Sequence, residues 1–387
     1  MTAQSPAKPG TMVATTIVLA AGGSGGHIYP ARALAEVLIG RGHKVVLITD
    51  RRGAAFDDAL PQVEVHRVQA GAPSGRGFWG KIDGVGRILR GLFEARRILH
   101  GLRPAAVVGF GGYASVPTIM AATRQGLVTL VHEQNAVLGR ANRMLAARVG
   151  KIATAFPSIR GVSDRDSAKL SRTGNPIRSE IAALAQAPYD TPTEQHPLNL
   201  LVFGGSQGSR ALSLLVPAAV AALPADRRSR LAIAQQCRPE DLEEVRAAYA
   251  RIEQQVELAT YFTDMGARLG RSQLAITRAG ASTIAELAGA GRPSILIPYP
   301  FATDDHQRAN AEALAAAGGA WVMIEKETTA ETLAQTLTRL IDAPEALADA
   351  AEHARAFGIV DAADRLADLV EDCARLRSQP VERRALG

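Results

Sequence analysis

The chain has 387 residues, which is long enough for two domains of ordinary size, each with its own core. Hydrophobic residues make up 47% of the chain and charged residues 21%, the proportions of a soluble globular protein. The net charge of +6 favours an anionic partner without choosing between nucleic acid, nucleotide and membrane. Cys237 and Cys373 form no CxxC motif, which argues against a disulfide framework or a cysteine zinc site and favours a reducing cytosol.

Residues 1–12 are polar and proline-rich, and they predict a disordered tail. They lack the apolar core of a signal peptide, since the first apolar run begins at Val13 and soon reaches a glycine loop. No window approaches about 18 uninterrupted apolar residues, so no membrane-spanning helix is predicted.

The first motif, "VLAAGGSGGHIYPARALAEVL" at 18–38, places a glycine loop between an apolar strand and an amphipathic helix. Such a loop aims backbone N–H groups at a phosphate. It is neither a P-loop, which needs a lysine, nor a dinucleotide fingerprint, because Ile28 stands where the third glycine belongs. His27 follows at the predicted helix N-terminus, where the helix dipole keeps an imidazole neutral. His27 is therefore a candidate general base, with a purely structural capping role as the alternative.

The same order of strand, glycine loop and helix returns at 198–223, "LNLLVFGGSQGSRALSLLVPAAVAAL". Apolar strands alternate with helical patterns before and after it, which indicates two doubly wound parallel sheets. We expect an N-terminal domain at 13–177, a C-terminal domain at 178–355, and a helical segment at 356–387 that packs back on the first domain. "TGNPIR" at 173–178 is the expected first crossing. Ligands of such sheets bind at the carboxyl ends of strands, which places the site in the cleft between the domains.

Two further segments of the N-terminal half place polar groups at this cleft. They are "GFGGYASVP" at 109–117 and "HEQNAVLGRANR" at 132–143. The latter contains His132, Glu133 and Asn135, whose alternative role is ordinary hydrogen bonding within a loop.

In the C-terminal half, "TRAGASTIAELAGAGRPSILIPYP" at 277–300 is a third strand, glycine turn and helix. Glu286 lies within two turns of the expected helix start, where a carboxylate can accept hydrogen bonds from a ribose diol; the alternative is a solvated helix charge. "DDHQRANA" at 304–311 opens another helix, with Gln307 in its first turn.

Two other signals do not support a site. The DxD spacing of Asp164–Asp166, which some transferases use to bind a metal, falls in a polar loop, so no metal site is predicted there. Basic residues are not interleaved with aromatic ones as single-strand nucleic-acid binding requires, so nucleic acid is not an expected partner.

Taken together and in order, the motifs above resemble those of the bacterial MurG family, UDP-N-acetylglucosamine transferases that convert lipid I to lipid II in peptidoglycan synthesis. They extend from Gly22 to Ala311, most of the chain. The resemblance implies a GT-B fold of two Rossmann-like domains. It also implies an inverting transfer of N-acetylglucosamine to the muramic acid 4-hydroxyl of an undecaprenyl diphosphate carrier.

The resemblance assigns roles to matching positions. The implied substrate-binding residues are Ser24, Gly25, Gly26, Asn135, Arg178, Ser206, Phe262, Ala281, Ser282, Thr283, Glu286 and Gln307. Asn135 and Gln307 would contact the donor sugar, Arg178 and Ser206 the nucleotide diphosphate, and the 281–286 segment phosphate and ribose, with Glu286 on the diol. The family often has threonine at Ser24, and an aliphatic residue at Phe262, whose backbone would contact uracil.

Uridine diphosphate is a good leaving group, so this reaction needs positive potential on the diphosphate and one general base. Helix N-termini and Arg178 can supply the potential. His27 is the first candidate for the base and His132 the second. The scheme requires no cofactor and no metal, although divalent cations could stimulate it.

The implied partners are UDP-GlcNAc, lipid I and an anionic membrane surface, and other cell-wall synthesis and division proteins are compatible with the resemblance. The alternatives are a transferase that forms glycolipids on diacylglycerol, an epimerase of the same nucleotide sugar, and a non-catalytic nucleotide-sugar sensor or membrane scaffold.

Residues 74–104 predict how a chain without a spanning helix reaches a lipid-linked acceptor. The segment is strongly basic, and its Phe78 and Trp79 are expected in a glycine-rich loop before a helix. The stripe of Ile88, Leu92, Ala95, Leu99 and Leu102 is expected to pack on the sheet. We expect Phe78 and Trp79, with Arg76 and Lys81, to attach the protein peripherally to the cytoplasmic face of the inner membrane.

Overall fold

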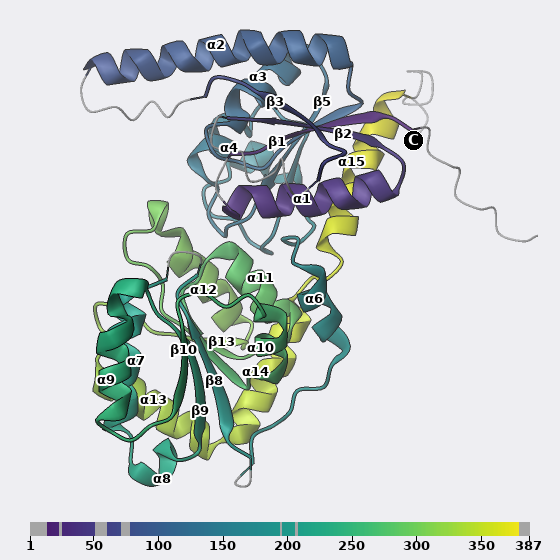
Figure 1. The fold of residues 1–387 in the computed structure, drawn as a ribbon. Helices are drawn as coiled ribbons and strands as arrows, with labels where there is room; N and C mark the ends of the chain where they lie inside the picture. The colour runs from purple at the N-terminus through teal and green to yellow at the C-terminus, as the bar shows by residue number, and fades with distance from the viewer. Residues whose placement is uncertain are drawn as a thin grey trace, which may run out of the picture.

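The computed structural model describes residues 14–22, 25–50, 60–70, 78–193, 196–205 and 208–378. The described chain forms two lobes, one above the other, each built on a parallel sheet with helices on both faces (Figure 1). The predicted tail at 1–12 lies outside the described residues. In the described part, no helix combines the length and apolar character that crossing a bilayer requires.

The N-terminal sheet has the strand order β3-β2-β1-β4-β5-β6-β7, and every pair is parallel. The order reverses beside β1, so the carboxyl ends of β1 and β4 open a crevice at the edge of the sheet that faces the other lobe. The strands are β1 (Thr16–Ala20), β2 (Lys44–Thr49), β3 (Glu64–Arg67), β4 (Ala106–Gly109), β5 (Val128–Glu133), β6 (Lys151–Thr154) and β7 (Leu170–Arg172).

Alternate residues of β1 serve two cores. Leu19 faces α1 (Gly25–Gly40) and α15 (Ala362–Ser378), while Val18 faces the helices on the opposite side. Those helices are α2 (Phe78–Leu102), α3 (Ser115–Arg124) and α4 (Arg140–Leu145). Both faces of the sheet are thus covered, as the near-continuous apolar runs of its strands require.

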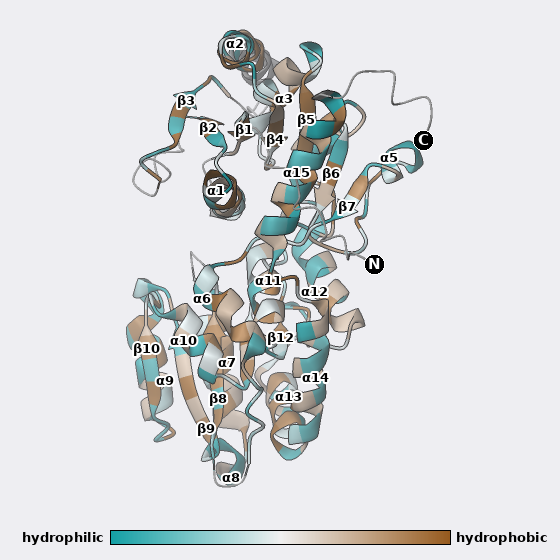
Figure 2. Cartoon of the chain, turned by 90° about the vertical axis from the view of Figure 1, so that its right-hand side faces the viewer, coloured by the Kyte–Doolittle hydropathy of each residue, from teal (hydrophilic) through white to brown (hydrophobic). Residues whose placement is uncertain are grey.

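The C-terminal sheet repeats this plan with the order β10-β9-β8-β11-β12-β13, again all parallel. Its strands are β8 (Leu198–Phe203), β9 (Leu231–Gln236), β10 (Val256–Ala259), β11 (Leu274–Thr277), β12 (Ser294–Leu296) and β13 (Ala320–Val322). Figure 2 shows apolar stretches of β8 and β9 between the helices that cover them. Leu200 and Val202 face one core, and Leu201 and Phe203 face the other.

Helices cover both faces of the second sheet. Those packed on the core of Leu200 include α7 (Arg210–Ala222), α9 (Leu242–Ala250) and α13 (Ala330–Asp342), and those on the core of Phe203 include α10 (Met265–Arg271), α11 (Ala281–Gly289), α12 (His306–Ala316) and α14 (Pro344–Phe357). The remaining short turns are α5 (Asp164–Ser167), α6 (Ser179–Ala182), η2 (Ala183–Gln186), α8 (Ala225–Arg228), η3 (Pro239–Asp241) and η4 (Thr303–Asp305). Pro217 lies inside the buried helix α7.

The chain crosses between the lobes twice. The first crossing follows β7, and the second follows α14, after which α15 lies against α1 in the N-terminal lobe (Figure 1). Hydrophilic and hydrophobic residues alternate along α15 (Figure 2), and its Leu366 and Val370 are fully buried in the core that contains Leu34 and Leu38. Burying such side chains contributes roughly 1.5–3 kcal/mol each.

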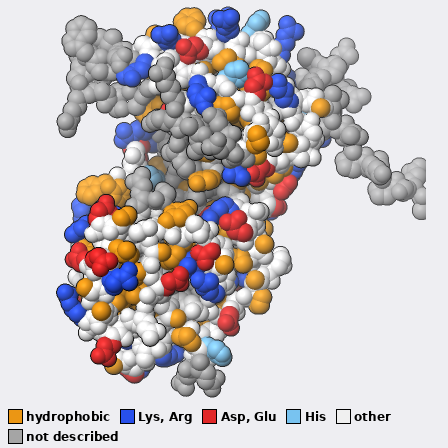
Figure 3. Space-filling model, viewed as in Figure 1, with side chains coloured by type: hydrophobic (Ala, Val, Ile, Leu, Met, Phe, Trp, Pro, Cys, Tyr) orange, Lys and Arg blue, Asp and Glu red, His pale blue; other side chains and the backbone are white. Residues whose placement is uncertain are grey.

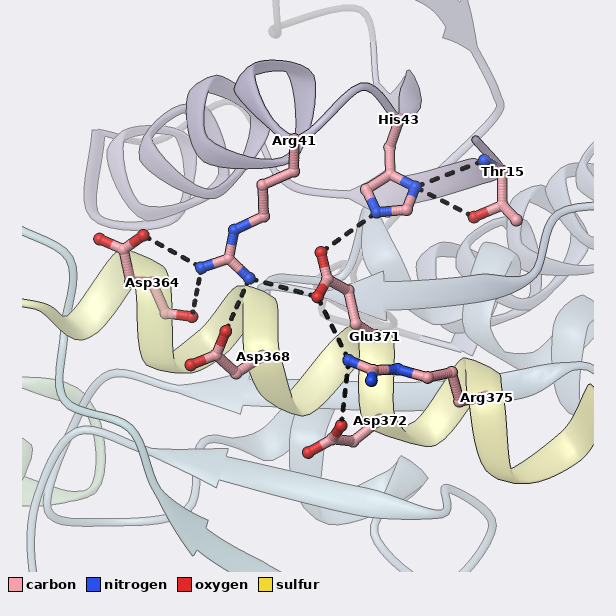
Figure 4. Close-up of polar contacts among 8 residues, drawn as sticks. All are labelled: Thr15, Arg41, His43, Asp364, Asp368, Glu371, Asp372 and Arg375. Carbon is pink, nitrogen blue, oxygen red and sulfur yellow. Dashed lines mark hydrogen bonds and ion pairs between the residues drawn. The ribbon is translucent and has the colours of Figure 1, made fainter. Parts of the chain in front are cut away.

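Polar contacts fix the register of α15 (Figure 4). Arg41 bridges to Asp364 at 3.1 Å and to Asp368 at 2.6 Å. Glu371, which is almost fully buried, bonds Nε2 of His43 at 3.1 Å, and Nδ1 of that ring lies 3.1 Å from the hydroxyl of Thr15. The network joins α15 to the residues that flank β1 and β2, so the last described helix is part of the first lobe.

One sequence prediction about this lobe is wrong. Phe78 and Trp79 do not precede the helix: α2 begins at Phe78, so both belong to its first turn. The glycine-rich composition of 80–91 suggested a loop, but i,i+4 backbone bonding continues through it because glycine costs a helix only about 1 kcal/mol per residue. The expected stripe does face inward, with Ala95 and Leu99 fully buried.

Candidate active site

A cavity of about 420 Å³ lies between the lobes. Its walls come from α1, from the first crossing and α6, and from the carboxyl ends of the C-terminal strands. The lining contains five residues predicted to bind substrate: Arg178, Phe262, Ser282, Thr283 and Glu286. Sequence positions as distant as 178 and 286 therefore meet at one cavity.

Arg178 and Glu286 pair with each other in this cavity. Nε of Arg178 donates to one carboxylate oxygen at 2.8 Å and the terminal nitrogen donates to the other at 3.0 Å, the two-pronged geometry of a strong charged pair. Burial alone would lower the pKa of Arg178, but the Glu286 carboxylate holds it above its ordinary value. Arg178, which is predicted to contact a diphosphate, thus pairs with Glu286, which is predicted to contact a ribose diol.

The N-terminus of α11 forms another wall. Its N-cap, Gly280, has an extended backbone and supplies no side-chain acceptor, so the first N–H groups of the helix are not capped by a side chain. Ser282 and Thr283 add hydroxyls in the first turn, and both line the cavity. Uncapped N–H groups with the positive end of a helix dipole suit a phosphate.

Gln307 lies in the first turn of α12 and, like His27 and Asn135, is not part of the cavity lining. Its Oε1 accepts from the backbone N–H of Ala279 at 3.2 Å and of Tyr299 at 3.0 Å, and so it joins the loops that follow β11 and β12. This use of Oε1 fixes the orientation of the carboxamide. In this orientation Nε2 can donate a hydrogen bond to the oxygen of a hydroxyl group.

Asn135 lies in the loop after β5, whose backbone and side-chain N–H groups donate to the carboxylate of Glu133. Glu133, which is buried, accepts from Gly139 N and Asn142 Nδ2 at 2.8 Å each and from Asn135 N at 3.1 Å. Burial outweighs these hydrogen bonds and raises the pKa of Glu133. The alternative role considered for Glu133, hydrogen bonding within its own loop, is the one that the structure shows.

His27 lies where the first glycine loop becomes α1. Its imidazole packs flat against Gly111 and Gly112, whose φ values of 85° and 70° favour glycine. A Cβ at Gly111 would lie 3.2 Å from Cδ2 of His27 and 3.6 Å from Nδ2 of Asn142, so both side chains lie close to this glycine. Burial lowers the pKa of His27, which keeps the ring neutral and able to accept a proton at neutral pH.

His132, the second candidate base, is placed differently. It is fully buried, its Nε2 lies 2.9 Å from the carbonyl oxygen of Gly174, and its Nδ1 lies 3.1 Å from the amide of Gln134. Burial lowers its pKa to about 4. Both ring nitrogens have protein partners and the ring is fully buried, so His132 joins β5 to the first crossing, and His27 remains the first candidate for the base.

Not every predicted residue can be placed. Ser24 and Ser206 lie outside the described residues, whereas Gly25 and Gly26 form the start of α1. The second glycine loop reaches the cavity through Gly205. Phe262 lines the cavity but is nearly buried, with the guanidinium carbon of Arg268 3.8 Å from its ring centroid. Ala281 is only half-buried at the start of α11.

Sequence reasoning missed several residues of the cavity wall. Tyr29 on α1 and Tyr261 beside β10 both line it and are 59% and 61% exposed. Only 4% of the residues in this chain are aromatic, so each tyrosine in the sequence was a candidate for a binding surface. That scarcity was the signal that could have pointed to Tyr29 and Tyr261. Arg32 and Glu36 also line the cavity and pair at 2.8 Å on the exposed side of α1.

The described residues contain no cluster of three or more His, Cys, Asp or Glu side chains suited to a metal. The DxD carboxylates have a local structural use, since Asp166 accepts from Ser163 Oγ at 2.7 Å and pairs with Lys169 at 2.8 Å. These contacts tie α5 to β7.

Comparison with known proteins agrees with this geometry. Residues 17–154 match the glycosyltransferase family 28 N-terminal domain and residues 199–366 match the family 28 C-terminal domain. A relative from Rhodospirillum centenum, named UDP-N-acetylglucosamine–N-acetylmuramyl-(pentapeptide) pyrophosphoryl-undecaprenol N-acetylglucosamine transferase, is 54% identical over 94% of this chain and 97% of its own. A relative of the same name from Paramagnetospirillum magneticum is 52% identical over 92% of this chain and 95% of its own.

Solved structures give the same result. The crystal structure of Acinetobacter baumannii MurG matches with a TM-score of 0.77 and 30% identity, covering 92% of this chain and 99% of that one. The UDP-GlcNAc 2-epimerase of Neisseria meningitidis, bound to UDP-GlcNAc, matches with a TM-score of 0.62 and 13% identity over 95% of this chain and all of that one, which shows a shared fold alone. The chain has the GT-B fold and belongs to the MurG family of the family 28 glycosyltransferases.

Proposed function

We propose that this chain transfers N-acetylglucosamine from UDP-GlcNAc to the muramic acid 4-hydroxyl of lipid I, with inversion, giving lipid II. The observation that supports it most is the cavity between the lobes, where Arg178, Glu286 and the uncapped N-terminus of α11 converge. These groups offer a cation, a diol acceptor and backbone N–H donors, the set that a nucleoside diphosphate requires.

In this proposal the donor lies on the C-terminal lobe. The diphosphate meets the N-terminus of α11 and Arg178, and Glu286 exchanges its partner Arg178 for the ribose diol. Positive potential at this position stabilises the charge that develops on the departing diphosphate. Gln307 and Asn135 contact the sugar from opposite lobes.

The acceptor lies on the N-terminal lobe, and His27 takes the proton from its 4-hydroxyl. The lowered pKa of His27 makes the neutral, proton-accepting form dominant at cytosolic pH. The glycine pair at 111–112 lets the His27 ring approach the backbone closely, since neither residue carries a side chain. No cofactor takes part in this scheme.

The purified full-length chain should convert UDP-GlcNAc and a soluble lipid I analogue to UDP and the lipid II analogue, detected by mass spectrometry. Parallel reactions with diacylglycerol as acceptor and with donor alone distinguish glycolipid synthesis and epimerisation. Three outcomes would contradict the proposal. They are release of UDP only when diacylglycerol is the acceptor, formation of the epimerised donor, and binding of the donor without turnover.

We further propose that the protein attaches to the anionic inner membrane face through α2. This helix lies on the outer edge of the N-terminal lobe, away from the other lobe, where basic and apolar side chains lie together (Figures 1 and 3). Leu89 and Phe93 lie one turn apart and are 51% and 68% exposed, and Arg90 and Arg97 are exposed beside them. The predicted contacts Phe78, Trp79 and Lys81 lie in the preceding turns, although their side chains, and all of Arg76, are outside the description.

Each arginine near an anionic surface contributes about 1 kcal/mol of salt-sensitive attraction, while apolar side chains insert independently of salt. Co-sedimentation with vesicles containing phosphatidylglycerol should therefore fall for Leu89→Ser/Phe93→Ser and for Phe78→Ser/Trp79→Ser. Leu376→Ser, on an exposed leucine of α15, serves as control. Unchanged binding of both double variants would place the membrane contact on another surface.

A further inference from the structure

Asn310 makes contacts in both lobes. It lies on α12 of the C-terminal lobe, one turn after Gln307, and its side chain is fully buried. Its Oδ1 accepts from the backbone N–H of Ala136 at 2.8 Å, and its Nδ2 donates to Oδ1 of Asn135 at 3.1 Å and to the carbonyl oxygen of Ala279 at 3.0 Å. One carboxamide thus joins the loop after β5 to the loop after β11.

These contacts fix the conformation of Asn135. Its Oδ1 accepts from Asn310, and its Nδ2 lies 3.4 Å from Oε1 of Glu133, so both ends of its amide have protein partners. Ala279 is held just as completely, because its N–H donates to Gln307 and its carbonyl accepts from Asn310. Ala279 immediately precedes Gly280, the N-cap of the helix that forms the phosphate wall.

The other polar contacts between the same elements are exposed. Arg140 reaches Asp304 at 3.0 Å and Arg160 reaches Glu312 at 2.8 Å, with both arginine side chains more than 60% exposed. Such pairs are screened by solvent and contribute little. Removing the carboxamide of Asn310 instead leaves three polar partners without their hydrogen bonds, two of them in buried contacts, which costs far more.

We propose that Asn310 is a positioning residue for the transfer reaction: it holds Asn135 of the acceptor lobe in register with the donor site on α11. The proposal rests on the function proposed above, in which Asn135 contacts the donor sugar. Asn310 does not line the cavity, and it acts through Asn135. Its loss should therefore impair the alignment of the sugar while leaving nucleotide contacts, which lie within the other lobe and the crossing, in place.

The test compares Asn310→Ala, Asn310→Asp, Asn135→Ala and the double variant Asn135→Ala/Asn310→Ala in the full-length chain. Asn310→Ala should keep the Kd for UDP within about 3-fold and lower kcat by roughly 10–100-fold, the scale of a small misalignment of reacting groups. Asn310→Asp keeps an acceptor for Ala136 but loses both N–H donors, so it should lose at least as much. The double variant should be no slower than Asn135→Ala alone.

A control and a second readout separate this role from a general loss of structure. Asn199→Ala removes a half-buried asparagine whose Nδ2 bonds Gln273 within the C-terminal lobe, and it should leave kcat and UDP affinity unchanged. Amide hydrogen exchange in the segment 132–139 should quicken in Asn310→Ala and much less in Asn310→Asp. This measurement stands even if lipid I is not the acceptor, so a failed transferase assay would not be confused with a failed positioning role.

The proposal would be overturned if the kcat losses of Asn135→Ala and Asn310→Ala multiplied in the double variant. A parallel loss of UDP affinity and kcat in Asn310→Ala would also overturn it. Unchanged exchange at 132–139 in Asn310→Ala would do so as well, because it would show that the loop does not depend on Asn310.

Discussion

The two sides of the region between the lobes use polar residues in opposite ways. On the cavity side, Arg178, Glu286, Tyr29 and Tyr261 line an open space, and the charged pair there joins residues whose expected partners are parts of a substrate. Outside that lining, in a region that we call the hinge side, His132 and Asn310 are fully buried, and each of their side-chain nitrogen and oxygen atoms has a protein partner. Polar groups of the same chemical type thus differ in whether they line an open cavity or are enclosed by protein.

This difference has a measurable meaning. A residue whose partners are in place contributes to folding stability, and its removal leaves buried groups unpaired. A residue that lines the open cavity contributes instead to substrate binding or to turnover. Variants on the cavity side should therefore change kinetics at constant stability, and variants on the hinge side should change stability first.

The largest effect is expected at His27, which lies in the first turn of α1, two residues before Tyr29 of the cavity lining. His27→Ala should lower kcat by about 10²–10⁴, the usual contribution of a general base, and keep the Kd for UDP-GlcNAc within a few-fold. The pH profile is a second check. Because burial lowers the pKa of His27, protonation should reduce kcat only below pH 6.5, and this acid limb should be missing from the variant. Near-normal turnover would remove His27 from the role.

His132, on the hinge side, should affect stability and its pH dependence. Its pKa is about 4 in the folded chain against 6.5 in the unfolded one, so between these values the unfolded state binds more protons. The stabilisation from neutral His132 is complete above pH 6.5 and is lost as pH falls toward 4, an effect of up to about 3 kcal/mol. Urea unfolding from pH 7 to 4.5 should be less pH-dependent for His132→Gln. An unaltered slope would show that another group dominates.

Glu286→Ala should weaken UDP-sugar binding by roughly 1.5–3 kcal/mol through the lost bond to the ribose diol. Isothermal titration with UDP-GlcNAc and its 2′-deoxyribose analogue measures this. The deoxy analogue should bind the native chain less tightly but lose little further affinity for the variant. Fully additive losses would mean that Glu286 does not contact the diol. Unfolding stability should change little, in contrast to His132→Gln.

The smallest effect is expected for the exposed hinge-side pair of Arg140 and Asp304. The guanidinium of Arg140 lowers the pKa of Asp304, but the 61% exposure of the Arg140 side chain leaves the pair strongly screened. A double-mutant cycle by urea unfolding should give a coupling of about 0–1 kcal/mol that declines with salt. The exposed pair of Arg365 on α15 and Asp361, just before that helix, is a matched reference. A coupling well above that of the reference would make the exposed contacts, rather than buried Asn310, the main bond between the lobes.

Much of the fold was predictable because its signals are local. Apolar runs such as that ending at Ala20, followed by glycine loops and amphipathic helices, specify a doubly wound sheet without any knowledge of distant contacts. The gathering of Arg178 and Glu286 at one cavity could also be anticipated, because Arg178 ends the expected first crossing, Glu286 follows a strand end of the second sheet, and both places border the cleft between the domains.

The parts of the site that could not be predicted depend on the direction in which side chains point, and the hydrophobic pattern of the sequence does not specify that direction. His132 lies in β5 and Asn135 follows it; His132 is fully buried, whereas Asn135 is half-buried and bonds Asn310 of the other lobe, because a strand's alternation does not continue into its loop. Leu89 and Phe93 lie on the same helix as the inward stripe, and only the packing of α2 on α3 reveals that they are exposed. Asn310 was part of a quoted motif, but its partners in the N-terminal lobe are more than 170 positions away in sequence.

The attachment of α15 to the N-terminal lobe has a consequence for synthesis. The core that contains Leu34 and Leu38 is completed by residues 362–378, so a ribosome must translate the entire C-terminal lobe before the first lobe can close. Until then the apolar face of α1 that α15 will cover remains accessible to chaperones or to aggregation. The second lobe, whose sheet and core helices come from one continuous stretch of chain, can fold first, which reverses the usual order in which domains emerge and mature.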